Sequence, residues 1–88
     1  MKIKPEFILS YEEGDISIMR CRPDGTMEYV SPLSDAAAMA WEGFQRGVSR
    51  EAIIDAVVNE FDGAEPRAVA EDLDALTAQL IALGYAEE

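Results

Sequence analysis

The first third of the chain has the apolar spacing of β-strands. Between Phe7 and Val30 the apolar residues are mostly β-branched or aromatic, and turn sequences interrupt them at Glu12-Glu13-Gly14-Asp15 and Pro23-Asp24-Gly25. The pattern predicts three strands, at residues 7–11, 16–22 and 26–30. Because the turns are short, neighbouring strands are antiparallel, and we expect one three-stranded sheet.

From Leu33 onward the apolar residues recur every three or four positions, which indicates amphipathic helices. Three such stripes are present, at residues 33–44, 53–61 and 69–83. Ser34 and Ser49 stand where a side-chain oxygen caps a helix N-terminus, and Pro66 stands where proline begins a helix. The sequence therefore predicts a three-stranded antiparallel sheet followed by three α-helices.

The length of 88 residues fits one small α+β domain over residues 1–88. Three strands joined to three short helices can form a winged-helix-like domain, or winged helix-turn-helix, a fold that often binds DNA. The net charge of −11 argues against DNA, because a nucleic-acid surface needs basic residues for the phosphates. The second predicted helix offers Arg50 against Glu51, Asp55 and Glu60. A winged-helix DNA-binding domain is kept as an alternative.

The residue types argue against catalysis. The chain has no His, the commonest general base, and its single cysteine, Cys21, has no base to activate it. Adjacent acids around Asp72 fit an exposed helix start better than an acid–base pair. We predict a protein that is not an enzyme and has no catalytic, cofactor-binding or metal-binding residues, with Cys21 partly buried in a strand.

The sequence also indicates a location. The positive N-terminus is not followed by the apolar segment of a signal peptide, and no apolar run approaches the roughly 20 residues of a membrane span. A lone cysteine fits a reducing compartment. We expect the protein to be cytoplasmic, with no membrane or nucleic-acid partner.

Binding of a peptide is the remaining class. A three-stranded sheet has open edges that a foreign strand can complete, and residues 26–30 contain no Pro or Gly. A shielding helix is an equally good interpretation of that edge. Met27 and Tyr29 point to one face of the strand, and we expect the third helix to lie beside this edge, with one flank of its leucine stripe facing the sheet and another lining a groove.

The chain resembles the PqqD-like family of peptide-binding domains, also called RiPP precursor-peptide recognition elements. The similarity covers roughly residues 5–86 and lies in Leu33-Ser34-x-Ala36-Ala37-x-x-Ala40-Trp41, Gly47, Ser49, Ile53 or Ile54, Phe61, Val69-x-x-Asp72-Leu73-x-x-Leu76 and Gly84-Tyr85. The family often has Asp-Gly after the first helix, whereas this chain has Arg46-Gly47.

The resemblance implies a peptide chaperone for natural product biosynthesis. Such a domain binds the leader segment of a ribosomally made precursor peptide as an added strand, beside the third helix, and presents it to a modifying enzyme, frequently a radical-SAM enzyme. Whether two copies exchange strands into a homodimer is left open. The implied peptide-binding residues are Thr26, Met27, Glu28, Tyr29, Val30, Asp72, Leu76 and Gln79.

An acyl or peptidyl carrier protein is a further alternative, because small acidic helical domains carry phosphopantetheine on a serine at a helix start. Ser34 is the candidate serine, but its surroundings read Leu33-Ser34-Asp35 rather than Asp-Ser-Leu. The predicted strands also have no place in a helical carrier bundle.

Overall fold

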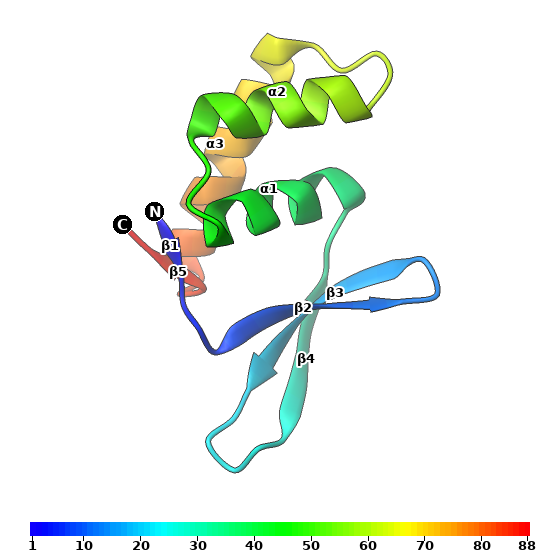
Figure 1. Ribbon diagram of the computed structural model, residues 1–88. Coiled ribbons are helices and arrows are strands. Elements are labelled where there is room, and N and C mark those ends of the chain that lie inside the picture. The colour runs from blue at the N-terminus through cyan, green and yellow to red at the C-terminus, as the bar shows by residue number, and fades with distance from the viewer.

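The computed structural model describes all of residues 1–88. It contains three antiparallel strands followed by three helices, with one two-residue strand near each terminus (Figure 1). The elements are β1 (Lys2–Ile3), β2 (Phe7–Glu12), β3 (Asp15–Cys21), β4 (Met27–Pro32), α1 (Asp35–Gln45), α2 (Arg50–Glu60), α3 (Pro66–Ala82) and β5 (Ala86–Glu87). The predicted α+β fold and the type and order of its six main elements are confirmed.

The strands β2, β3 and β4 form an antiparallel meander in that order. Leu9 lies opposite Ile18, and Glu28 lies opposite Arg20. The β3–β4 register shifts between Ile18 and Met19, which leaves one extra residue in β4. β4 starts one residue later and ends two residues later than the strand that the sequence pattern predicts at residues 26–30.

The turn between β3 and β4 is held by the side chain of Asp24. Its Oδ1 accepts from the backbone N–H of Thr26 at 2.9 Å and from the Thr26 hydroxyl at 2.6 Å. Both bonds hold the pKa of Asp24 below its ordinary value, and the bond from the Thr26 hydroxyl has the larger effect. Gly25 follows with φ +87°, a conformation that glycine adopts without strain.

The helix starts agree with the sequence pattern. The Ser34 hydroxyl accepts from the N–H of Ala37 at 3.2 Å, and the Ser49 hydroxyl accepts from the N–H of Ala52 at 3.2 Å. Pro66 is the first residue of α3. Each serine satisfies a backbone donor that the first helical turn leaves free.

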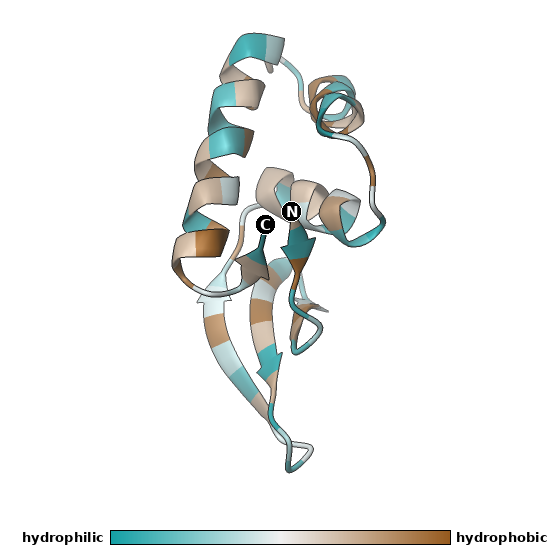
Figure 2. Cartoon of the chain, turned by 90° about the vertical axis from the view of Figure 1, so that its left-hand side faces the viewer, coloured by the Kyte–Doolittle hydropathy of each residue, from teal (hydrophilic) through white to brown (hydrophobic).

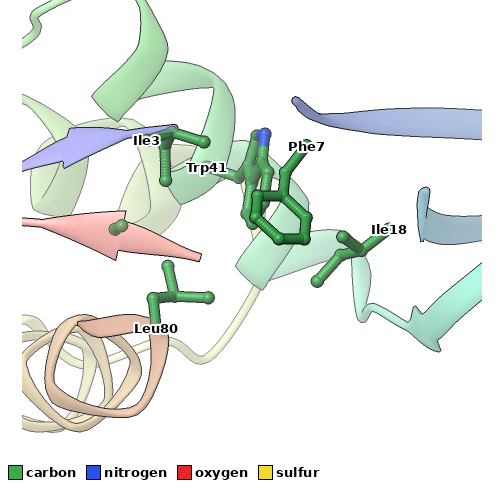
Figure 3. Packing of buried hydrophobic residues seen from close by; sticks show 6 residues of the cluster. Ile3, Phe7, Ile18, Trp41 and Leu80 are labelled. Carbon is green, nitrogen blue, oxygen red and sulfur yellow. The ribbon is translucent and has the colours of Figure 1, made fainter. Parts of the chain in front are cut away.

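Two buried clusters hold the elements together. The first joins the meander to α1, to the end of α3 and to the terminal strands, around the fully buried Trp41 (Figure 3). The second lies between the three helices and includes Ala40, Ile53 and Leu73. Phe44 and Leu76 pack against both clusters, so the helices and the sheet share one continuous apolar interior.

The two ends of the chain pair with each other. β1 runs antiparallel to β5, with Ile3 opposite Ala86, and the N–H of Lys4 donates to the carbonyl of Tyr85 at 3.0 Å. Figure 1 shows this ribbon on the side of the molecule away from the β2–β3 hairpin. The C-terminal segment therefore covers β1 and leaves the outer edge of β4 without a partner strand.

Candidate functional site

The outer edge of β4 has backbone groups free to pair. β4 lies at one end of the meander and is bonded to β3 alone. The N–H of Arg22 donates to the carbonyl of Thr26 at 2.9 Å, so the Thr26 carbonyl points toward β3. Because backbone groups alternate along an antiparallel strand, Met27 and Tyr29 direct their N–H and C=O groups outward, and Glu28 directs its own inward, toward Arg20.

The side chains of this strand divide between two faces. Met27 and Tyr29 are 48% and 58% exposed, whereas Val30 packs against the cluster around Trp41. Tyr29 lies opposite Met19, which lies opposite Ile8. The outer face of the sheet thus carries a row of partly exposed apolar side chains that ends at the free edge.

Two of the predicted edge residues have backbone groups that are already bonded within the hairpin. The N–H of Thr26 is bonded to Asp24 and its carbonyl to Arg22. The backbone of Glu28 faces β3, and its carboxylate accepts from Arg22 Nη2 at 2.6 Å. That hydrogen bond lowers the pKa of Glu28, and the positive charge of Arg22 adds to the effect. The edge proper consists of Met27 and Tyr29.

A cavity of about 590 Å³ opens between the three helices. Its volume lies within the range of ordinary ligand pockets. The core residues Ala40, Ile53, Val57 and Leu73 contribute to its lining. The remaining lining residues are Ser34, Ala36 and Ala37 before and in α1, Phe61, Gly63, Ala64 and Glu65 between α2 and α3, and Ala68, Val69, Asp72 and Leu76 in α3.

The cavity and the free edge are connected through the chain. β4 ends at Pro32, and Ser34, two residues later, already lines the cavity. The β3–β4 hairpin extends away from the helices in both views, so β4 runs from its distant tip toward the helical half (Figures 1 and 2). An extended segment alongside β4 therefore passes from the hairpin tip toward the cavity.

The predicted helix residues separate into two groups. Asp72 and Leu76 line the cavity, whereas Gln79 is exposed on α3 and does not line it. Met27 and Tyr29 are not among the lining residues either. Leu76 packs against both buried clusters, including the one that Val30 of β4 contacts.

Sequence reasoning did not find the small residues that make the cavity hollow. Ala36, Ala37 and Ala68 stand at positions where larger apolar side chains would fill the space between the helices. The signal available in the sequence was the alanine run at 36–38 at the start of an otherwise bulky helix. Alanine favours helices in any context, so the run alone does not indicate a cavity.

The ion pairs of the helical half lie outside the cavity. Arg50 binds Asp74 through two bonds, at 2.8 and 2.9 Å. This contact raises the pKa of Arg50 and lowers that of Asp74, in each case chiefly through the side-chain hydrogen bonds. Arg67 lies 3.7 Å from Glu71. Glu65 and Asp72 line the cavity and take part in none of the ion pairs.

Other chemistry finds little support. No group of three or more His, Cys, Asp or Glu side chains is placed to hold a metal ion. Cys21 is exposed at the end of β3, so the expectation of a partly buried thiol was wrong.

Ser34 lies at the start of the helix that follows the three strands in the chain, and a carrier bundle has no such sheet. None of the helices is long and apolar enough to cross a membrane.

An open strand edge is the kind of surface to which an extended peptide can add as a further strand. Comparison with solved structures shows the same fold in two leader-peptide complexes. TbiB1 in complex with the TbiA(beta) leader peptide matches with a TM-score of 0.75 and 21% identity, over 99% of this chain and 95% of that one. Lasso peptide synthetase B1 complexed with the leader peptide matches with a TM-score of 0.76 and 23% identity, over 99% and 96%.

No protein-family model and no curated protein matches the chain. The structural comparison nevertheless confirms the fold implied by the resemblance to PqqD-like domains, over almost the whole length of both chains.

Proposed function

We propose that this chain is a non-catalytic peptide-binding protein that captures the leader segment of a ribosomally made precursor peptide by strand addition to β4. The observation that carries the proposal is the free backbone of Met27 and Tyr29 on a strand that leads to an open cavity. The two structural neighbours, both bound to leader peptides, support it.

Strand addition supplies the first part of the binding free energy. Each hydrogen bond formed with the edge contributes about 0.5–1.5 kcal/mol net. A disordered leader loses roughly 2–5 kcal/mol on ordering, so a few edge bonds are barely sufficient. Their value is in alignment, since they fix the peptide beside β4 in one register.

Apolar side chains supply the rest. Burying one large apolar side chain contributes roughly 1.5–3 kcal/mol, and the cavity of about 590 Å³ has room for one or two of them. Tyr29 and Met19 provide a second apolar surface on the outer face of the sheet. One anchor in the cavity and one beside Tyr29 would exceed the ordering cost.

We assign the chemical modification of the precursor peptide to a separate enzyme that receives the bound precursor, such as a radical-SAM enzyme. The chain itself requires no cofactor for this role. The same β4 edge would also allow two copies to pair, and a homodimer formed in this way would compete with the leader.

Hydrogen exchange at single amides tests the proposal. The probes are synthetic leader segments of any short peptide found to be encoded beside the gene for this chain, with scrambled versions as controls. In the free protein the Glu28 amide should exchange slowly and the Met27 and Tyr29 amides quickly. A bound leader should slow Met27 and Tyr29. Binding that leaves both amides fast would contradict strand addition.

A further inference from the structure

Two carboxylates at the cavity have no cation to balance them. Glu65 immediately precedes α3 and Asp72 lies seven residues further on, and both line the cavity. Seven residues are close to two helical turns, so these carboxylates lie on one side of α3, about 10 Å apart along its axis. Neither takes part in an ion pair within the chain.

The other charged groups nearby leave this region negative. Asp35 begins α1 and Asp62 lies in the loop before α3, and both are exposed. The nearest cation along α3 is Arg67, which is 92% exposed and lies beside Glu71. The N-terminus of α1 is positive, but Ser34 caps it and Asp35 offsets its dipole.

Apolar surface lies between the two carboxylates. Ala68 and Val69 stand between Glu65 and Asp72 along α3, and Leu76 follows one turn later. An occupant that is apolar where it enters the cavity and positive where it meets the carboxylates would match this surface. In an extended peptide, residues two apart project to the same side, so one residue must separate the apolar side chain from the cation.

We infer that the cavity selects leader segments in which one residue separates an apolar anchor from a Lys or Arg, with the anchor between the two carboxylates and the cation held by one of them, Glu65 or Asp72. This inference rests on the proposed function and specifies its substrate class. The net charge of −11 favours the same partners through faster encounter at low salt. Exposed ion pairs are weak, so each carboxylate should contribute about two- to fivefold in affinity.

Selection from a displayed library of random twelve-residue peptides tests the inference. The full chain is compared with the double variant Glu65→Gln/Asp72→Asn and with a matched control, Asp55→Asn/Glu60→Gln, which removes the same charge from exposed positions of α2 outside the cavity. Circular dichroism verifies that all three are folded. We expect the wild type and the control to enrich Lys or Arg two positions from an apolar residue, and the double variant to lose this preference.

The outcomes separate the inference from the proposed function. Peptides that bind in a Tyr29-dependent manner but show no cation preference would overturn the inference and leave strand addition standing. Recovery of no binding peptide would overturn both. A dimer in sedimentation that Ala68→Arg dissociates would assign the cavity to a second copy and overturn the inference as well. For a selected peptide, the affinity difference between wild type and double variant should shrink in 0.5 M salt, roughly where the Debye length falls below 5 Å.

Discussion

The backbone N–H of Arg22 donates to the carbonyl of Thr26 across the β3–β4 hairpin, at 2.9 Å. This bond sets the alternation of β4 and therefore decides which residues can accept a guest strand. By that alternation Met27 and Tyr29 face outward, while Glu28 faces Arg20. Neighbouring positions on one strand thus have different roles, which makes substitution by proline informative.

Tyr29→Pro should weaken leader binding by about three- to tenfold, because proline removes an outward N–H worth about 0.5–1.5 kcal/mol. Glu28→Pro should instead destabilise the fold by about 1–3 kcal/mol, because it removes a donor to β3. Calorimetric titration and urea unfolding measure the two effects. Tyr29→Ala, which keeps the N–H, is the control for the side chain. Equal effects of the two proline variants on stability would contradict the alternation.

Ala68→Phe should block the cavity. Ala68 is exposed and lines the cavity, so the new ring can occupy the space without disturbing the core. Loss of one buried anchor of about 1.5–3 kcal/mol predicts a ten- to hundredfold lower affinity for the leader in a calorimetric titration. Ala78→Phe, at an exposed position of α3 outside the cavity, is the matched control and should bind normally. If Ala68→Phe binds the leader with unchanged affinity, the cavity is not part of the binding site.

Gly43→Ala should destabilise the packing of α1 on α2. A Cβ at position 43 would lie 2.7 Å from Cγ1 of Ile53, closer than packed atoms allow. Overpacking of this kind costs about 1–3 kcal/mol, measured as a lower urea midpoint. The double variant Gly43→Ala/Ile53→Ala should lose less stability than the two single variants lose together, because Ile53→Ala removes the clash. Strictly additive losses of stability would mean that the Gly43→Ala variant relieves its close contact with Ile53 in another way.

The ion pair of Arg50 with Asp74 should lose its contribution in acid. The hydrogen bond from Arg50 holds the folded pKa of Asp74 below its ordinary value of 3.8. Its stabilisation is therefore present above pH 3.8 and disappears as the pH falls through the lower folded value. The difference in urea midpoint between wild type and Arg50→Gln should accordingly shrink below pH 3.8. Arg46→Gln removes an arginine without an ion pair and controls for net charge. An NMR titration of Asp74 in Arg50→Gln should show its pKa rising toward 3.8.

The elements and their order could be predicted because their signals are local. Helix caps at Ser34 and Ser49, proline at the start of α3 and the turn at Asp24 all act within four residues along the chain. The charge balance likewise follows from composition alone, and an excess of acidic residues disfavours nucleic acid as a ligand. The resemblance to PqqD-like domains then indicated the β4 edge and the α3 positions Asp72 and Leu76.

Three features depend on contacts between distant residues. The β1–β5 ribbon joins Ile3 to Ala86, and strands of two residues carry no readable period. The pairing of β3 with β4, which places Arg20 opposite Glu28, decides that Met27 and Tyr29, rather than Glu28, face outward. The cavity exists because the side chains that α1 and α3 direct toward each other there are small.

The sequence by itself determined a small acidic α+β domain with its helices, strands and caps, because short-range geometry and apolar periodicity specify these. The tertiary structure decided which strand edge stays open, which backbone groups point outward and where α3 leaves space beside α1. Strand register and helix packing are set by many weak long-range contacts, whose outcome no single segment of the chain contains.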